Sequence, residues 1–224
     1  MGADPRDEAS DRSIRAVAEP VIRQVNSALR ETVNLGVPKG QRVYRVCIIA
    51  GSKDSGGIAQ VGDGDYFHCT ALGKAILAFQ SPELGAAHPH DELLRLTDHT
   101  ILDKRRLFVK LSEVHRRAYA ADRDENEAGN GCFGVPVRDR RGLLVAASSA
   151  SLCSDWVTHI REFEGSESVM AAARWIETKL ARRRDGVRDR SGGASQRSRP
   201  RWHGRQSSST SHVGGSIVAT DEVD

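Results

Sequence analysis

Two pairs of strand-like segments constrain the fold of this chain more than any other feature of its sequence. Residues 31–37 alternate apolar and polar side chains, and the apolar run 42–50 follows after the turn sequence PKGQ. Further along, residues 131–137 and 143–151 have a similar character and are joined by RDRRG. Two strands joined by a short polar turn are typical of an antiparallel hairpin. The sequence therefore predicts an antiparallel sheet that contains two hairpins.

Four segments with helical periodicity lie before, between and after these hairpins. Apolar side chains recur at helical spacing in residues 14–29, 70–79, 102–118 and 165–184. Pro20 interrupts the first segment and predicts a kink, or a helix that begins at this residue. Thr70 is the expected N-cap of the second helix, and Ser166 or Ser168 that of the last. Helices in this order around an antiparallel sheet predict an α+β domain with the helices packed on the sheet.

Composition divides the chain into a folded body and two tails. The chain has 224 residues, of which 38% are hydrophobic, and this is enough for one full core. Residues 182–205 contain nine Arg and two Asp, and aliphatic side chains almost vanish from there until Val213. A segment that cannot bury apolar surface cannot offset the entropy lost on ordering. We therefore expect a disordered N-terminus over 1–12, one domain over 13–184 and a disordered Arg/Ser/Gly-rich tail over 185–224.

Charge and cysteine usage narrow the class of protein. The formal net charge of +3 comes from the C-terminal tail, so the body offers no electrostatic reason to bind nucleic acid. The four cysteines are widely spaced and form no CxxC pair. The N-terminus lacks the apolar run of a signal peptide, and no run approaches the roughly 18 residues of a membrane span. These features predict a cytoplasmic protein with reduced thiols and no membrane partner.

Two motifs indicate a family. HCTALGKAILAF spans residues 68–79, and AYAADRDENEAGNGCFGVPV spans residues 118–137 and continues into the second hairpin. Together they resemble the effector-binding domain of the IclR family of bacterial and archaeal transcription regulators, and the likeness covers roughly residues 14–182. The resemblance implies a GAF-like fold whose antiparallel sheet, flanked by helices, encloses a small-molecule pocket. Two departures, Tyr66-Phe67 before His68 and Gly131 before the cysteine, lie beside this pocket and leave the ligand open.

The resemblance also implies which residues bind the ligand. They come from the helix start, the acidic loop and the last strand: Ala71, Leu72, Asp122, Cys132, Ser149 and Ser151. The first N–H groups of a helix are unpaired and partly positive, which suits a carboxylate. Two serines two positions apart on a strand point to the same face. In the acidic loop we expect Asp122 to turn inward, and the remaining acids Asp124, Glu125 and Glu127 to face water.

Other chemistries are possible for these residues. The loop acids could form a general acid/base pair or ligate a hard metal, but the EF-hand pattern is absent and exposed acids are the simpler interpretation. Cys132 could be a nucleophile, although nearby acids would raise its pKa and a buried pocket wall fits better. Cys69 beside His68 lacks a second ligand pair at metal spacing. We expect neither a metal nor another cofactor.

These observations predict a sensing domain for a small organic acid or a related metabolite, not an enzyme. The resemblance implies a homodimer or homotetramer. The family's winged helix-turn-helix would precede residue 14, where only about a dozen polar residues stand, so DNA contact is expected only through a partner or a missing N-terminal domain. The alternative is a free-standing GAF-like thiol enzyme, such as a sulfoxide reductase, that uses Cys132 or Cys69.

Overall fold

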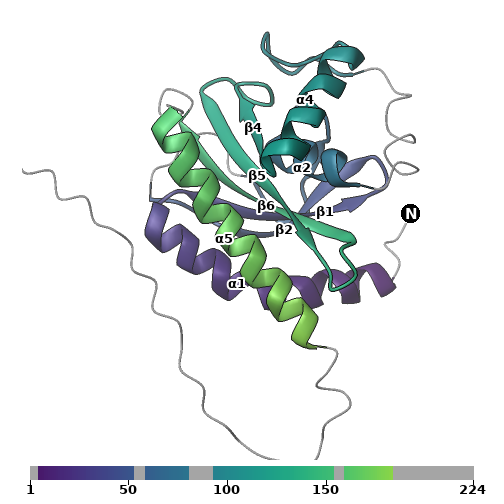
Figure 1. The fold of residues 1–224 in the computed structure, drawn as a ribbon, viewed down its shortest axis with the longest axis vertical. Coiled ribbons are helices and arrows are strands. Elements are labelled where there is room, and N and C mark those ends of the chain that lie inside the picture. The colour runs from purple at the N-terminus through teal and green to yellow at the C-terminus, as the bar shows by residue number, and fades with distance from the viewer. Residues whose placement is uncertain (1–4, 53–58, 81–92, 154–158, 184–224) are drawn as a thin grey trace, which may run out of the picture. The chain divides into compact units, whose positions relative to one another are not determined.

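The structure is a computed structural model that describes residues 5–52, 59–80, 93–153 and 159–183. Helices and strands alternate in groups along the chain (Figure 1). In chain order they are α1 (Pro5–Leu29), β1 (Thr32–Lys39), β2 (Arg42–Ile49), β3 (Gly64–Tyr66), α2 (Ala71–Phe79), α4 (Lys104–Arg117), β4 (Ala120–Arg123), β5 (Asn130–Arg138), β6 (Leu144–Cys153) and α5 (His159–Arg183). No helix within these ranges is long and apolar enough to cross a membrane.

One six-stranded sheet runs through the domain in the order β3-β2-β1-β6-β5-β4. Every neighbouring pair of strands is antiparallel. Both predicted hairpins are present, as β1–β2 and β5–β6, and pairing between β1 and β6 joins them into one sheet. The predicted fold class, an α+β domain with an antiparallel sheet flanked by helices, is therefore confirmed.

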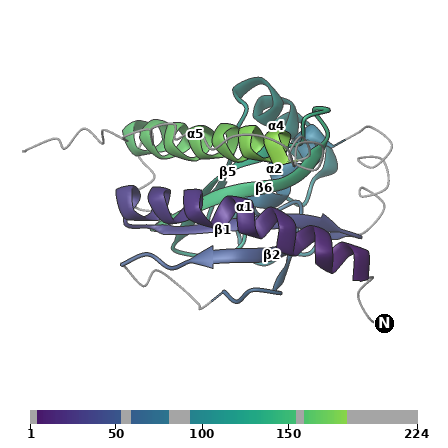
Figure 2. The same ribbon diagram turned by 90° about the horizontal axis from the view of Figure 1, so that it is seen from below.

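Helices α1 and α5 cover one face of this sheet (Figure 2). The strands present Val33, Leu35 and Val37 from β1 and small alanines from β6 to this side. Ile22 of α1 and Ile176 of α5 pack against them and are fully buried. Apolar alternation on the strands and helical spacing on α1 and α5 thus meet in one large core.

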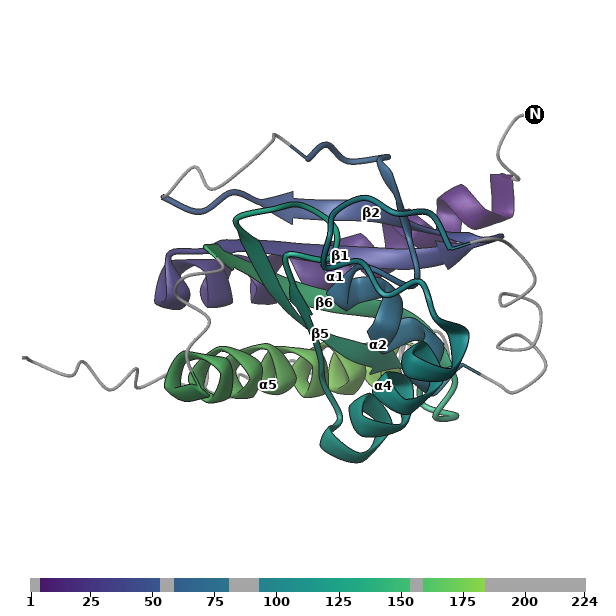
Figure 3. The ribbon, with the colours of Figure 1, turned by 90° about the horizontal axis from the view of Figure 1, so that it is seen from above.

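Helix α2, with α4 beside it, covers the opposite face (Figure 3). Two glycines allow α2 to pack directly against β5 and against the chain that precedes the helix. A Cβ at Gly134 of β5 would stand 2.4 Å from the carbonyl oxygen of Ala71, and one at Gly73 would stand 2.4 Å from that of Phe67. Real Cβ atoms do not approach backbone so closely, so the start of α2 is held tightly between the sheet and the chain before it.

Three expectations about helix ends have different outcomes. Thr70 is the N-cap of α2 as predicted, and its Oγ1 accepts a hydrogen bond from the N–H of Gly73 at 3.0 Å. Helix α1 begins at Pro5, so residues 5–12, which we expected to be disordered, are helical. Pro20 lies inside α1 on an exposed side, where water can solvate the carbonyl that loses its helical partner.

The remaining expectations concern α5 and the tail. Helix α5 begins at His159, so Ser166 and Ser168 lie inside it and the prediction that one of them is the N-cap is wrong. No proline stands between His159 and Ser166, and α5 continues through Gly165. The tail predicted over 185–224 lies outside the described residues.

Candidate functional site

Strand register gathers polar side chains into one row on the face covered by α2. Asp122 of β4 pairs with Cys132 of β5, Cys132 with Ser151 of β6, and Ser151 with Thr32 of β1. Residues opposite each other in a ladder point to the same face. In the adjacent row Gly134, Ser149 and Asn34 pair in the same way. Polar groups from four strands therefore meet on one side of the sheet.

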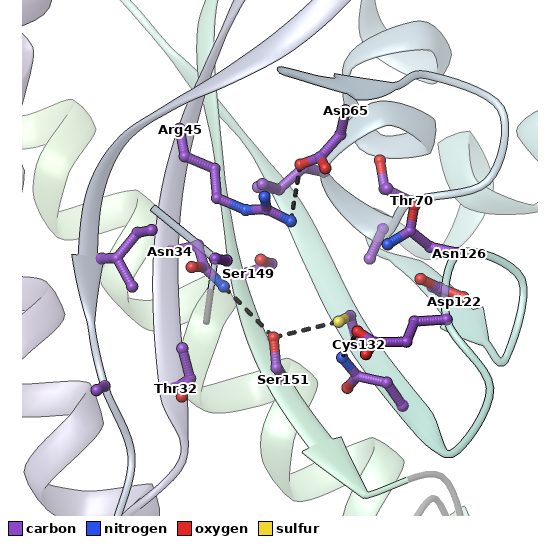
Figure 4. Close-up of a pocket in the computed structure, with 17 residues that line it drawn as sticks. Thr32, Asn34, Arg45, Asp65, Thr70, Asp122, Asn126, Cys132, Ser149 and Ser151 are labelled. Carbon is purple, nitrogen blue, oxygen red and sulfur yellow. Dashed lines mark hydrogen bonds and ion pairs between the residues drawn. The ribbon is translucent and has the colours of Figure 1, made fainter. Parts of the chain in front are cut away.

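These two rows line a cavity of about 130 Å³ (Figure 4). Thr70, Ala71 and Leu72 at the start of α2 complete one side of it. All six residues that the sequence singled out line this cavity: Ala71, Leu72, Asp122, Cys132, Ser149 and Ser151. Their arrangement around one space is thus as expected, while their role in binding stays a prediction.

Ser151 lies at the centre of a small hydrogen-bond network. Its Oγ accepts from the Cys132 thiol, with 3.2 Å between Sγ and Oγ, and from Nδ2 of Asn34 at 3.4 Å. Within the described part of the chain no acceptor takes the proton of the Ser151 hydroxyl. This proton is therefore available to an acceptor in the cavity.

The two cysteines near the cavity are poorly suited to nucleophilic chemistry. Burial, reinforced by the carboxylate of Asp122, raises the pKa of the Cys132 thiol to about 12. The same causes raise the pKa of Cys69 to about 12, and its Sγ lies 3.6 Å from Oδ1 of Asn126. Because a thiol attacks as its thiolate, both groups are protonated and unreactive near neutral pH.

Asp122 turns inward as predicted and is only 3% exposed. Its Oδ1 accepts a hydrogen bond from the N–H of Glu125 at 2.9 Å. Burial raises the pKa of the Asp122 carboxyl to about 7, against the opposing effect of the Lys74 ammonium. Near neutral pH this carboxyl can therefore act either as a donor or as an acceptor toward a ligand.

Glu125 does not face water, and this part of the prediction is wrong. The residue is 7% exposed, and its Oε1 pairs at 2.5 Å with Nζ of Lys74, which is completely buried in α2. The hydroxyl of Thr100 donates to the Glu125 carbonyl at 2.7 Å and helps to hold this part of the loop inward. A lysine within the apolar helix 70–79 requires a buried acidic partner, and this was the signal that could have identified Glu125. Asp124 and Glu127 are half-buried and so face water in part, and Glu127 also lines the cavity.

Several polar residues of the cavity wall were missed from the sequence, among them Asn34, Arg45 and Asp65. Arg45 of β2 and Asp65 of β3 form an ion pair across the cavity wall, with 2.8 Å between Nη2 and Oδ2, and both side chains are largely buried (Figure 4). Burial raises the pKa of the Asp65 carboxyl, and Arg45 opposes this effect. Nε of Arg45 and Oδ1 of Asn34 are buried and have no hydrogen-bond partner among the described residues. The cavity wall thus contains polar atoms that the described residues do not satisfy.

A metal centre is not supported by this geometry. Among the residues described, no group of three or more His, Cys, Asp or Glu side chains could hold a metal ion. His68 instead bonds through Nε2 to the carbonyl of Leu94 at 2.9 Å. Burial lowers the pKa of His68, which keeps the ring neutral near neutral pH.

Known proteins with similar sequences are transcription regulators. The BhcR regulator of Paracoccus denitrificans is 29% identical over 169 residues, which are 75% of this chain and 61% of that protein. The DNA-binding transcriptional repressor YiaJ of Escherichia coli is 28% identical over 178 residues, or 76% of this chain and 62% of that protein. The chain therefore spans about three fifths of the length of these two relatives.

Solved structures of transcription regulators also resemble this domain. The IclR structure from Thermotoga maritima superposes with a TM-score of 0.72 at 31% identity, covering 75% of this chain and 68% of that one. An IclR homologue from Microbacterium hydrocarbonoxydans, in complex with 4-hydroxybenzoate, superposes with a TM-score of 0.70 at 26% identity, covering 76% and 69%. The family model for the C-terminal domain of the bacterial transcriptional regulator IclR matches residues 7–178, and the chain therefore belongs to the IclR family through this effector-binding domain.

Proposed function

We propose that this domain binds a small organic acid in the cavity beneath α2 and serves as the effector-sensing part of a transcription regulator. The observation that carries the proposal is a cavity of about 130 Å³ whose lining residues include buried polar atoms without a partner in the described ranges. Buried polar atoms are costly unless they are hydrogen-bonded. A polar ligand of suitable size would satisfy them, and this makes occupancy favourable.

The start of α2 is the proposed position for the carboxylate of the ligand. Thr70 already satisfies the N–H groups of Gly73 and Lys74 through its side chain and carbonyl, at 3.0 and 2.9 Å. The preceding N–H groups belong to Ala71 and Leu72, which line the cavity. Unpaired N–H groups and the helix dipole favour an anion at this position. The hydroxyl of Ser151 can donate to the same ligand.

Cavity size limits the class of ligand. A cavity of roughly 150 Å³ accommodates benzene, so the space here suits a molecule of about six or seven non-hydrogen atoms. The solved homologue holds 4-hydroxybenzoate, which is also a small carboxylic acid. That complex supports acid binding in this family and does not identify the acid bound by this chain.

Signalling requires more than this domain. The relatives are DNA-binding regulators, so the proposal includes contact with DNA through a DNA-binding module or partner beyond residues 13–184, and assembly into a homodimer or homotetramer. A regulator that responds to metabolites and acts on DNA works in the cytoplasm, where we place the protein. The thiol-enzyme alternative is disfavoured because the pKa values of both candidate cysteines are raised to about 12.

A thermal-shift screen of short carboxylic acids, followed by calorimetry and product analysis, tests this function. An acid present at 100 times its Kd should stabilise the domain by roughly 2.7 kcal/mol and be recovered unchanged. The matching amides serve as controls and should have little effect, because they lack the negative charge. Chemical conversion of the acid, or equal stabilisation by acid and amide, would contradict the proposal.

A further inference from the structure

Two residues on one side of the cavity, Arg45 and Asn34, each carry a buried polar atom that lacks a hydrogen-bond partner among the described residues. Figure 4 shows Arg45 and Asn34 on one side of the cavity, with Asp122 and Thr70 on the opposite side. Nε of Arg45 is a buried donor without a partner, and Oδ1 of Asn34 is a buried acceptor without a partner. Asn34 is only 4% exposed, so bulk water reaches it poorly.

The surroundings fix the orientation of both groups. Nη2 of Arg45 is engaged by Asp65 at 2.8 Å, which holds the guanidinium in place. Nδ2 of Asn34 donates to Ser151 at 3.4 Å, which turns Oδ1 away from the serine. The donor and the acceptor are therefore positioned before any ligand arrives, and binding need not organise them.

A hydroxyl of the ligand can satisfy both atoms at once if it lies between them. It accepts a hydrogen bond from Nε of Arg45 and donates its own proton to Oδ1 of Asn34. A carbonyl oxygen or a carboxylate could accept from Arg45 but would leave the Asn34 oxygen facing another oxygen. An apolar group would leave both atoms unpaired, and buried unpaired polar atoms carry the larger part of the energetic cost.

We propose that the effector is a short hydroxy acid whose hydroxyl lies between Arg45 and Asn34. This inference rests on the proposed function, in which the carboxylate lies at the start of α2 on the opposite side. Arg45 and Asn34 are then the residues that determine specificity for a hydroxy acid over the oxo acid or plain acid of the same length. The small volume of about 130 Å³ favours hydroxy acids of about three or four carbons.

Calorimetry with five four-carbon acids tests this specificity. The probes are butanoate, its 2-hydroxy, 3-hydroxy and 4-hydroxy derivatives, and 2-oxobutanoate, titrated into the full chain and into Asn34→Leu and Asn34→Asp. At least one hydroxy acid should bind the wild type about tenfold tighter than butanoate and 2-oxobutanoate. Asn34→Leu should reduce this ratio to within about threefold, and Asn34→Asp, which keeps an acceptor oxygen, should preserve it. Circular dichroism confirms that each variant is folded.

The outcomes separate this inference from the proposed function. If butanoate or 2-oxobutanoate binds the wild type as tightly as every hydroxy acid, the inference is wrong while acid binding stands. A preference for the hydroxy acid that survives in Asn34→Leu also overturns it, because the acceptor would lie elsewhere. If none of the five acids binds the wild type, acid binding in this cavity fails and the inference fails with it.

Discussion

The two faces of the central sheet are built from the same strands and are both buried, yet they differ in chemistry. On β1, Leu35 points toward α1 and α5 and is fully buried, whereas its neighbour Asn34 points toward α2 and is 4% exposed. On β6, Ala150 belongs to the apolar core while Ser151 lines the cavity. Burial alone therefore does not distinguish the core from the binding site. The two are distinguished by unsatisfied polar atoms, which lie beside the cavity and mark the binding site.

The α1/α5 face follows the usual rule for a packed core, in which apolar side chains from both layers fill the space. The α2 face combines an apolar cluster around Ile76 and Val114 with polar rows that surround a cavity. A domain can leave such a cavity only if the rest of its core supplies enough stability. We infer that one face stabilises the fold and the other is specialised for binding.

The buried pair between Lys74 and Glu125 gives the largest expected effect on the α2 side. Lys74→Met should destabilise the domain by about 3 to 5 kcal/mol, because it leaves the Glu125 carboxylate buried without its partner. The double variant Lys74→Met/Glu125→Leu should recover much of this loss, since it removes both charges. Urea unfolding measures the difference, and Lys110→Met, a partly exposed lysine in α4, is the control. Equal stability of wild type and Lys74→Met would show that the pair is not buried as described.

Leu35 and Ser149 test the contrast between the two faces directly. Leu35→Ala should cost roughly 2 to 5 kcal/mol, because it leaves a hole in a filled core. Ser149→Ala, at a similarly buried site beside the cavity, should change the free energy of unfolding by less than about 1 kcal/mol. Chemical denaturation of both variants measures these values. Similar losses from the two changes would mean that the faces do not differ in the way proposed.

Asp122 predicts a dependence of stability on pH. Its pKa is raised to about 7 in the folded state and is about 3.9 in an unfolded chain, so the folded state favours the neutral carboxyl. Its contribution is fully present below about pH 4 and is lost as the pH rises through about 7, on the order of 2 to 4 kcal/mol in total. Asp122→Asn, which stays neutral, should lack this decline.

The check on this prediction is the difference in unfolding free energy between wild type and Asp122→Asn, measured from pH 4 to pH 8. The other titratable groups are the same in both proteins, so their contributions to the unfolding free energy cancel in the difference. A flat difference would show that the carboxyl is charged throughout this range and is more solvated than the structure indicates.

Elements with local signals could be predicted from the sequence. The hairpins follow from alternation and polar turns, and the start of α2 follows from Thr70, whose capping bond is present. Strand alternation places Ser149 and Ser151 on one face, whereas the family resemblance implied that Asp122 and Cys132 join them. Local patterns therefore identified the sheet, and the resemblance identified one side of the cavity.

The other side of the cavity depends on contacts between distant segments. The alternation in β1 predicts that Asn34 is a polar residue exposed to solvent. Only the packing of α2 shows that this face of the sheet is buried. The pairing of Arg45 with Asp65 depends on the register between β2 and β3, which no local pattern encodes. Glu125 lay within a run of acids that is usually exposed, and its burial depends on Lys74, 51 residues away.

The C-terminal tail gives the smallest expected effect. Residues 185–224 contain little that could join a core, so truncation after Arg184 should leave the midpoint of thermal unfolding unchanged within error. Differential scanning calorimetry of the full and truncated chains makes this comparison. A marked fall in the midpoint would move the domain boundary beyond residue 184.

Two serines on opposite faces of β6 provide the most direct test of the central claim that the cavity under α2 is the effector site. Ser151 lines the cavity, whereas Ser148 lies on the opposite side of the strand and its Oγ donates to the backbone carbonyl of Asn34 at 3.1 Å. The measurement is the Kd, by titration calorimetry, of the acid that most stabilises the wild type. Ser151→Ala should weaken binding by about 1 to 3 kcal/mol, or roughly 5-fold to 150-fold, and Ser148→Ala by less than about threefold. Unchanged affinity in Ser151→Ala, or an equal loss in both folded variants, would contradict the account.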